Sequence, residues 1–224
     1  MTEPSKTTET GLTSLRKEID SIDHELLHLL GKRRALSREV VKQKVLGSDV
    51  FRPDREAAMM RALISADPSG DARLVFALWR HIISASIAEQ KPDYLISHST
   101  NARDLARQHG AGFMKEDVKQ SATQAVGQLA DGLSDCAIIT TDELAEIQGD
   151  LGSDKGLYIA ASIPFLRHES DQTGFVICRN LPDDTDDDEV LVKQADGHLD
   201  AQKASEALPS AVIVGKYAKP IMQS

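Results

Sequence analysis

The chain has 224 residues, 41% of them apolar, which is enough for one large domain or for two small ones with a core each. Its net charge of −9 argues against nucleic acid and against an anionic membrane surface as partners. No run of about 18 apolar residues is present, so we expect no membrane span. The first eleven residues lack the pattern of a secretory signal, so we expect a cytoplasmic protein.

Charge is divided unevenly along the chain. Residues 12–91 contain 14 Lys and Arg against 11 Asp and Glu, whereas residues 93–224 contain 11 against 22. This division predicts a disordered tail at residues 1–11, a mildly basic domain at 12–91 that could attract a small anion, and an acidic domain at 92–224.

The first domain is predicted to consist of three helices. Residues 12–46 contain no proline and one glycine, and at about 1.5 Å per residue they would form a helix of about 50 Å, which needs an equally long packing partner. Pro53 opens a second helix that ends near residue 66, and a third spans about 71–90. The apolar stripe of the first helix consists of Leu15, Ile19, Ile22, Leu26, Leu29, Leu30, Leu36 and Val40.

After Pro92 the pattern alternates between apolar runs and helical segments, which indicates an α/β domain. The fold class is therefore α plus α/β: a three-helix domain followed by a smaller α/β domain. The acidic run at 181–189 is interpreted as a solvated loop. We expect strands at 94–99, 136–141, 157–162, 173–179, 189–195 and 211–218, and helices at 101–110, 121–133, 141–151 and around 201–208.

Metal-ligand spacing is not found in the sequence. Cys136 and Cys178 fit two buried thiols in a reducing compartment better than a disulfide framework or a metal site. A lone histidine such as His81 is more often a packing or surface residue than a ligand. We therefore expect no metal and no cofactor.

Cations lie on the packing face of the first helix. Arg33 falls on the apolar stripe, and Lys44 follows eleven residues later, close to three full turns, so both side chains project the same way. On the third helix Ser86 and Gln90 lie one turn apart. A single Arg on a helix is usually solvated or ion-paired, but several cations facing an apolar interior favour a small dicarboxylate ligand.

The sequence resembles the helical chorismate mutase family. The resemblance rests on L-R-x-x-I-D-x-I-D-x-x-L-L-x-L-L-x-x-R at 15–33, then Lys44, R-P-D-R-E at 52–56 and I-I-S-A-S-x-x-x-Q at 82–90. It implies an intertwined homodimer, joined through the long helix, in which each active site takes one arginine from the partner subunit. The implied substrate is chorismate and the implied product is prephenate.

The resemblance also implies a role for each site residue. Arg16 would be the cross-subunit residue, and Arg16 and Arg33 would hold the substrate carboxylates. Lys44 and Gln90 would donate to the ether oxygen whose bond breaks. The remaining roles are ring-hydroxyl binding by Glu56, a carboxylate contact by Ser86 and support of the site by Arg55. A pericyclic rearrangement needs a held conformation and such donors, and it needs no nucleophile or metal.

One departure from the family pattern is Arg52, which stands where many members carry an acidic residue four positions before the glutamate. Three consequences stay open: Arg52 weakens substrate binding, it alters the pH dependence of the activity, or it points to solvent without effect. Two other functions stay open on the same scaffold: an isochorismate pyruvate-lyase, and a regulator that kept the fold without the chemistry.

The second domain faintly resembles a degenerate prephenate dehydratase domain. That family has an acidic-Asn-Ser motif and a Thr-Arg-Phe triplet, where this chain has Asp142-Glu143-Leu144 and Thr173-Gly174-Phe175. Losing the arginine of the triplet removes the obvious carboxylate binder, so we do not expect dehydratase activity. Structural support, regulation by a ligand and docking to another enzyme are the remaining roles.

Overall fold

The computed structural model describes residues 6–43, 49–194, 199–206 and 212–223. The chain divides into two compact units, Met1–Ser48 and Asp49–Ser224, and each unit is described by itself. The first unit is a single helix, and the second contains the other helices and all the described strands. The domain boundary after residue 91 stays a prediction.

Helix α1 (Lys6–Gln43) confirms the predicted long helix, whose last residues, 44–46, lie outside the described ones. Its apolar stripe is exposed, with Leu15, Ile19 and Ile22 each more than half accessible to solvent. A stripe of this length is not compatible with a helix that is solvated all round. None of the described helices is long and apolar enough to cross a membrane.

Helices α2 (Pro53–Ala66) and α3 (Ala72–Gln90) confirm the two shorter helices. Pro53 is in the first turn of α2, where a missing N–H costs nothing. The side chain of Asp71 caps α3 by accepting a hydrogen bond of 2.9 Å from the backbone N–H of Leu74. The two helices pack against each other as a hairpin.

The rest of the second unit is built on an eight-stranded mixed sheet with the order β2-β1-β3-β6-β4-β9-β7-β8. Strands β1, β2 and β3 are parallel, whereas β6 is antiparallel to both β3 and β4. The elements are β1 (Leu95–Ser99), α4 (Arg103–Gly110), β2 (Lys115–Lys119), α5 (Ala122–Ala130), β3 (Cys136–Thr140), α6 (Leu144–Ile147), β4 (Tyr158–Ile163), β5 (Leu166–Arg167), β6 (Gly174–Cys178), β7 (Asp188–Lys193), β8 (Leu199–Lys203), β9 (Val212–Ala218) and β10 (Ile221–Met222).

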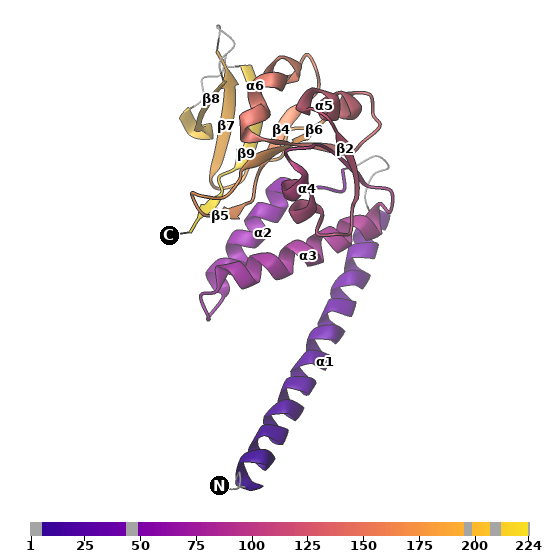
Figure 1. The fold of residues 1–224 in the computed structure, drawn as a ribbon, viewed down its shortest axis with the longest axis vertical. Coiled ribbons are helices and arrows are strands. Elements are labelled where there is room, and N and C mark those ends of the chain that lie inside the picture. The colour runs from indigo at the N-terminus through magenta and orange to yellow at the C-terminus, as the bar shows by residue number, and fades with distance from the viewer. Residues whose placement is uncertain (1–5, 44–48, 195–198, 207–211, 224) are drawn as a thin grey trace. The chain divides into compact units, whose positions relative to one another are not determined.

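Helices cover both faces of this sheet (Figure 1). Strand β3 shows why, because its side chains alternate between two apolar clusters. Ile138 packs with residues of α2, α3 and α4 on one face, and Ile139 packs with residues of α5 and α6 on the other. The α2–α3 hairpin therefore shares a core with the α/β part.

Three details differ from the predicted elements. Strand β2 was not predicted because its sequence, KEDVK, is charged; it is the edge strand of the sheet, where charges face water. The helix predicted around 201–208 is wrong for residues 201–203, which belong to β8, because pairing with β7 outweighs local helix propensity. The α/β part is also larger than the helical part, not smaller.

Close packing at Gly174 gives a first prediction. A Cβ there would meet the carbonyl oxygen of Ile139 at 2.2 Å and Leu105 Cδ1 at 2.7 Å. We expect Gly174→Ala to lower the free energy of unfolding by about 1–3 kcal/mol, measured by chemical denaturation.

The matched control is Gly127→Ala in α5, where a Cβ would meet no atom within 4 Å. Alanine is favoured over glycine inside a helix, so this change should raise the free energy of unfolding by up to about 1 kcal/mol. Equal stability of the two variants would contradict the strand packing described here.

Candidate functional site

The cations assigned to the substrate carboxylates lie on α1. Arg16 is exposed there, and Arg33 is half-buried. Lys44 lies outside the described residues. The roles of these three side chains stay predictions, since α1 is a compact unit of its own.

Glu56 lies in the first turn of α2, where the helix dipole favours acidic side chains. It forms an ion pair with Arg80 of α3, in which Arg80 Nη1 donates to Glu56 Oε2 at 2.9 Å. The two side chains are only 16% and 11% exposed. Burial raises the pKa of Glu56, and the charge of Arg80 partly offsets this.

The ion pair connects three helices. Arg80 Nε donates to the hydroxyl of Ser84 at 3.1 Å, and that hydroxyl donates to the carbonyl oxygen of His109 in α4 at 2.9 Å. Removing one partner of a buried pair leaves an uncompensated charge, which costs about 3–5 kcal/mol. This network fixes the hairpin against the α/β part.

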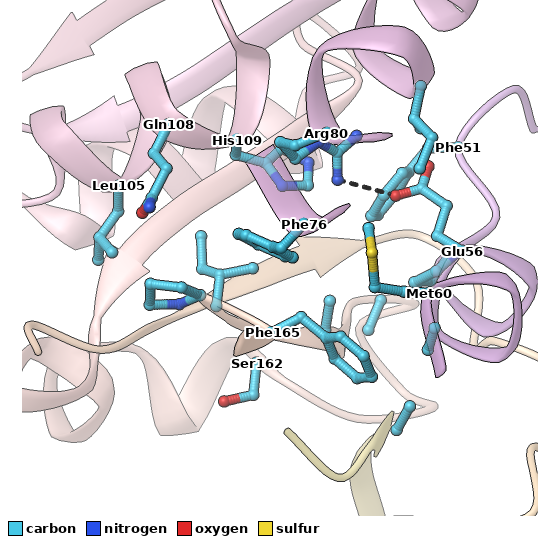
Figure 2. A pocket seen from close by; sticks show the side chains of 18 residues that line it. Phe51, Glu56, Met60, Phe76, Arg80, Leu105, Gln108, His109, Ser162 and Phe165 are labelled. Carbon is cyan, nitrogen blue, oxygen red and sulfur yellow. Dashed lines mark hydrogen bonds and ion pairs between the residues drawn. The ribbon is translucent and has the colours of Figure 1, made fainter. Parts of the chain in front are cut away.

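An inner cavity of about 60 Å³ lies beside this network, between the hairpin and the β4–β5 segment. Figure 2 shows aromatic side chains around it and the Glu56–Arg80 pair at one end. Most of its wall is apolar; the charged pair lies at one end, and the polar side chains of Gln108 and Ser162 lie elsewhere on the wall (Figure 2). The labelled lining residues are Phe51, Glu56, Met60, Phe76, Arg80, Leu105, Gln108, His109, Ser162 and Phe165.

His109 is the second polar group of that end. It is 5% exposed, and its ring meets Phe51 edge-on with centroids 5.2 Å apart. Burial lowers its pKa well below the ordinary value, and the charge of Arg80 adds to the effect. Among the described residues, neither His109 Nε2 nor Arg80 Nη2 has a hydrogen-bond partner.

Sequence reasoning missed Arg80 and His109. Arg80 interrupts an apolar stretch at 74–83, which was a usable signal, because a cation in such a stretch needs a partner. His109 gave no signal, since its burial depends on contacts between helices distant in the sequence.

The other assigned residues of the hairpin do not line the inner cavity described here. Arg55 is exposed on α2, and Gln90 is half-buried at the end of α3. Ser86 is buried, and its hydroxyl donates to the carbonyl oxygen of Ile82 at 2.8 Å. Arg80 and Ser86 are six positions apart, so their side chains point about 120° apart around the helix.

Arg52 forms ion pairs with two aspartates. Its guanidinium is 3.1 Å from Asp54 on α2 and 2.6 Å from Asp183 in the acidic loop. Arg61 also reaches this loop, donating to Thr185 Oγ1 at 3.2 Å. The acidic run is thus partly tied to α2 and is not only a solvated loop.

In the α/β part, polar residues at and around the two segments compared with the dehydratase motifs form hydrogen bonds with one another. Glu143 is buried and accepts hydrogen bonds from Ser99 Oγ at 2.7 Å and Asn101 Nδ2 at 3.0 Å. The Thr173 hydroxyl pairs with that of Thr141 at 2.8 Å. At Gly174 the space for an arginine side chain is filled by β3 and α4.

The two thiols are free, with Cys136 buried and Cys178 half-buried. Burial raises the pKa of Cys136 to about 12. The residues that the structure describes include no group of three or more His, Cys, Asp or Glu placed to hold a metal ion.

The burial of His109 predicts a pH dependence of stability. The folded chain keeps this imidazole neutral, whereas the unfolded chain binds a proton below pH 6.5. The free energy of unfolding should therefore fall as the pH drops below 6.5, by up to about 1.4 kcal/mol per pH unit from this residue. His109→Phe should remove this contribution when urea unfolding is compared across pH.

The control is His81→Phe, since His81 is exposed on α3 and also touches an aromatic ring, Phe113. This variant should keep the slope of the parent protein. A parent slope retained by His109→Phe would contradict the assignment.

Comparison with known proteins places the helical part in a sequence family. The model of the family described as chorismate mutase type II matches residues 15–91. A bifunctional chorismate mutase/prephenate dehydratase of Pseudomonas aeruginosa is 26% identical over 145 residues, covering 60% of this chain and 40% of the relative. That match is too long to end at residue 91, so it extends into the α/β part. The chain thus spans well under two thirds of this relative.

Two further relatives match over the helical part's length. An isochorismate pyruvate lyase of P. aeruginosa is 36% identical over 83 residues, which are 36% of this chain and 82% of the relative. A T-protein of Haemophilus influenzae is 38% identical over 82 residues, which are 35% of this chain and 22% of the relative.

Proposed function

Because the chain belongs to the chorismate mutase type II family, we propose that it is an isomerase that rearranges chorismate to prephenate. The observation that carries the proposal is the family match over 15–91, within which every residue that the resemblance assigns to the site is present. These residues are Arg16, Arg33, Lys44, Arg55, Glu56, Ser86 and Gln90.

The proposed catalysis is conformational and electrostatic. Arginines Arg16 and Arg33 bind the two carboxylates as bidentate pairs and hold the substrate in its reactive conformation. Lys44 and Gln90 donate to the ether oxygen as negative charge develops on it. Glu56 binds the ring hydroxyl. No proton transfer is required, so turnover depends on donors that are in place before the reaction.

We propose that the active protein is a homodimer with shared sites. The exposed stripe of α1 supports this, because Leu15, Ile19 and Leu26 are each about half exposed. Burying the rest of each side chain would contribute about 1–1.5 kcal/mol. A second copy offers a stripe of the same length. In this arrangement Arg16 of one subunit completes the site of the other.

The test is the loss of chorismate absorbance with the purified chain, with the product identified before and after acid treatment. We expect prephenate. Phenylpyruvate formed without acid would instead assign dehydratase activity to the α/β part, and no turnover would favour a regulator.

Lys44→Ala tests the assigned chemistry. Removing a donor to the developing charge should lower kcat by about 10²–10³-fold, with a smaller change in KM. Lys42→Ala is the matched control, because Lys42 is exposed and paired with Glu39 on α1. Full activity of the Lys44 variant would show that the site is assigned wrongly.

A second candidate is the lyase reaction, which removes pyruvate from isochorismate. It is favoured by the relative named isochorismate pyruvate lyase, of which this chain covers 82%. Pyruvate release from isochorismate, measured beside chorismate conversion, separates the two. A higher kcat/KM for isochorismate would make the lyase the main activity.

A further inference from the structure

The acidic loop, residues 181–189, is anchored on the segment that leads into α2. Arg52 is the residue directly before α2, and its Nη2 atom donates to Asp183 Oδ2 at 2.6 Å. Asn180, the residue before the loop, donates through Nδ2 to Asp49 Oδ2 at 2.6 Å. Each contact joins residues that are 131 positions apart in the chain. The two contacts therefore tie the α/β part to the start of the α2–α3 hairpin.

A second anchor of the loop lies farther along α2, at Arg61. Its Nη1 atom donates to Thr185 Oγ1 at 3.2 Å. Its Nη2 atom donates to two backbone carbonyl oxygens, that of Asp187 at 3.0 Å and that of Lys219 at 2.8 Å. The guanidinium also lies over the ring of Phe165, 5.5 Å from the ring centroid. A planar guanidinium meets all these partners at once, whereas a lysine ammonium could not.

The loop is braced internally between and beside these anchors. Asp188 is 8% exposed, and its Oδ2 atom accepts from the backbone N–H of Thr185 at 2.6 Å. Its Oδ1 atom accepts from the hydroxyl of Thr185, which itself accepts from Arg61. Pro182 is buried. The loop is therefore held in one conformation and can serve as a fixed point for α2.

Arg52 connects this fixed point to Glu56. The backbone N–H of Glu56 donates to the carbonyl oxygen of Arg52 at 3.0 Å, which is the first hydrogen bond of α2. The side chain of Glu56 is held by Arg80 at 2.9 Å. A misplacement of about 1 Å in an active site can lower the rate by about 10²-fold. The contact between Arg52 and Asp183 thus acts on the residue whose carbonyl sets where Glu56 lies.

We propose that the acidic loop positions the first turn of α2 for turnover, with Asp183, Asn180 and Arg61 as positioning residues. The inference rests on the function proposed above, in which Glu56 binds the ring hydroxyl. The positioning residues do not touch substrate in that assignment; they act through Arg52 and the backbone of α2. The α/β part thereby takes part in the activity of the helical part.

The first test is Asp183→Asn, which keeps the size of the side chain and removes its charge. Because Arg52 is 45% and Asp183 78% exposed, we expect kcat/KM for chorismate to fall only about twofold to fivefold at low ionic strength. Salt screens exposed charges, so the difference from the parent should nearly vanish at about 1 M salt. Asp183→Glu, which keeps the carboxylate, should restore most of the loss.

The matched control is Asp186→Asn. Asp186 is exposed in the same loop and is not among the partners of Arg52 or Arg61. This change removes the same charge from the same loop, so it separates the specific contact from the net charge. We expect the parent value of kcat/KM at both ionic strengths.

The second test measures amide hydrogen exchange over residues 49–61 by mass spectrometry and does not use chorismate. Exchange reports local opening of the backbone. At low ionic strength, Asp183→Asn should speed exchange in this segment, whereas Asp186→Asn should leave it unchanged. Circular dichroism confirms that each variant is folded.

Three outcomes would overturn the proposal. They are unchanged exchange in Asp183→Asn, faster exchange with kcat/KM at the parent value, and an equal fall of kcat/KM in Asp186→Asn. A parent chain that does not convert chorismate would contradict the proposed function instead. In that case faster exchange in Asp183→Asn alone would still support the hold of the loop on α2, and unchanged exchange would overturn it.

Discussion

The apolar stripe of α1 must be buried against a surface of matching length, and the proposed assembly depends on this constraint. A helix of 38 residues is about 57 Å long, well beyond what a small core can cover. Leu15, Ile19 and Leu26 are more than half exposed along it. In the proposed homodimer, a second copy of the helix would satisfy the constraint with a self-complementary interface. The same pairing would bring Arg16 of one subunit to the site of the other.

In the second unit, the main packing is that of helices on the two faces of the sheet. The α2–α3 hairpin and α4 cover one face of the mixed sheet, while α5 and α6 cover the other. The ion pair between Glu56 and Arg80 lies where the hairpin meets the sheet, and Ser84 connects it to α4. A residue that the resemblance assigns to substrate binding thus also holds the hairpin in place. Through Arg80 and Ser84, Glu56 is connected to the backbone of α4.

Much of the fold could be predicted from the sequence, because its signals are local. The apolar period of α1, Pro53 at the start of α2 and the stop before Pro92 each act within a few residues. Strand β2 and strand β8 could not be predicted, since their pairing partners determine them. The family motif supplied the candidate site, but the pairing of Glu56 with Arg80 and of Arg52 with Asp183 depends on tertiary contacts.

The shared dimeric site is tested most directly by subunit complementation. Arg16→Ala and Arg33→Ala chains, each inactive alone, are produced together in one cell so that mixed dimers can form. If each site takes Arg16 from one subunit and Arg33 from the other, mixed dimers contain one intact site, and chorismate conversion should recover to about a quarter of the parent value. Activity no higher than that of the separate variants would contradict the shared site.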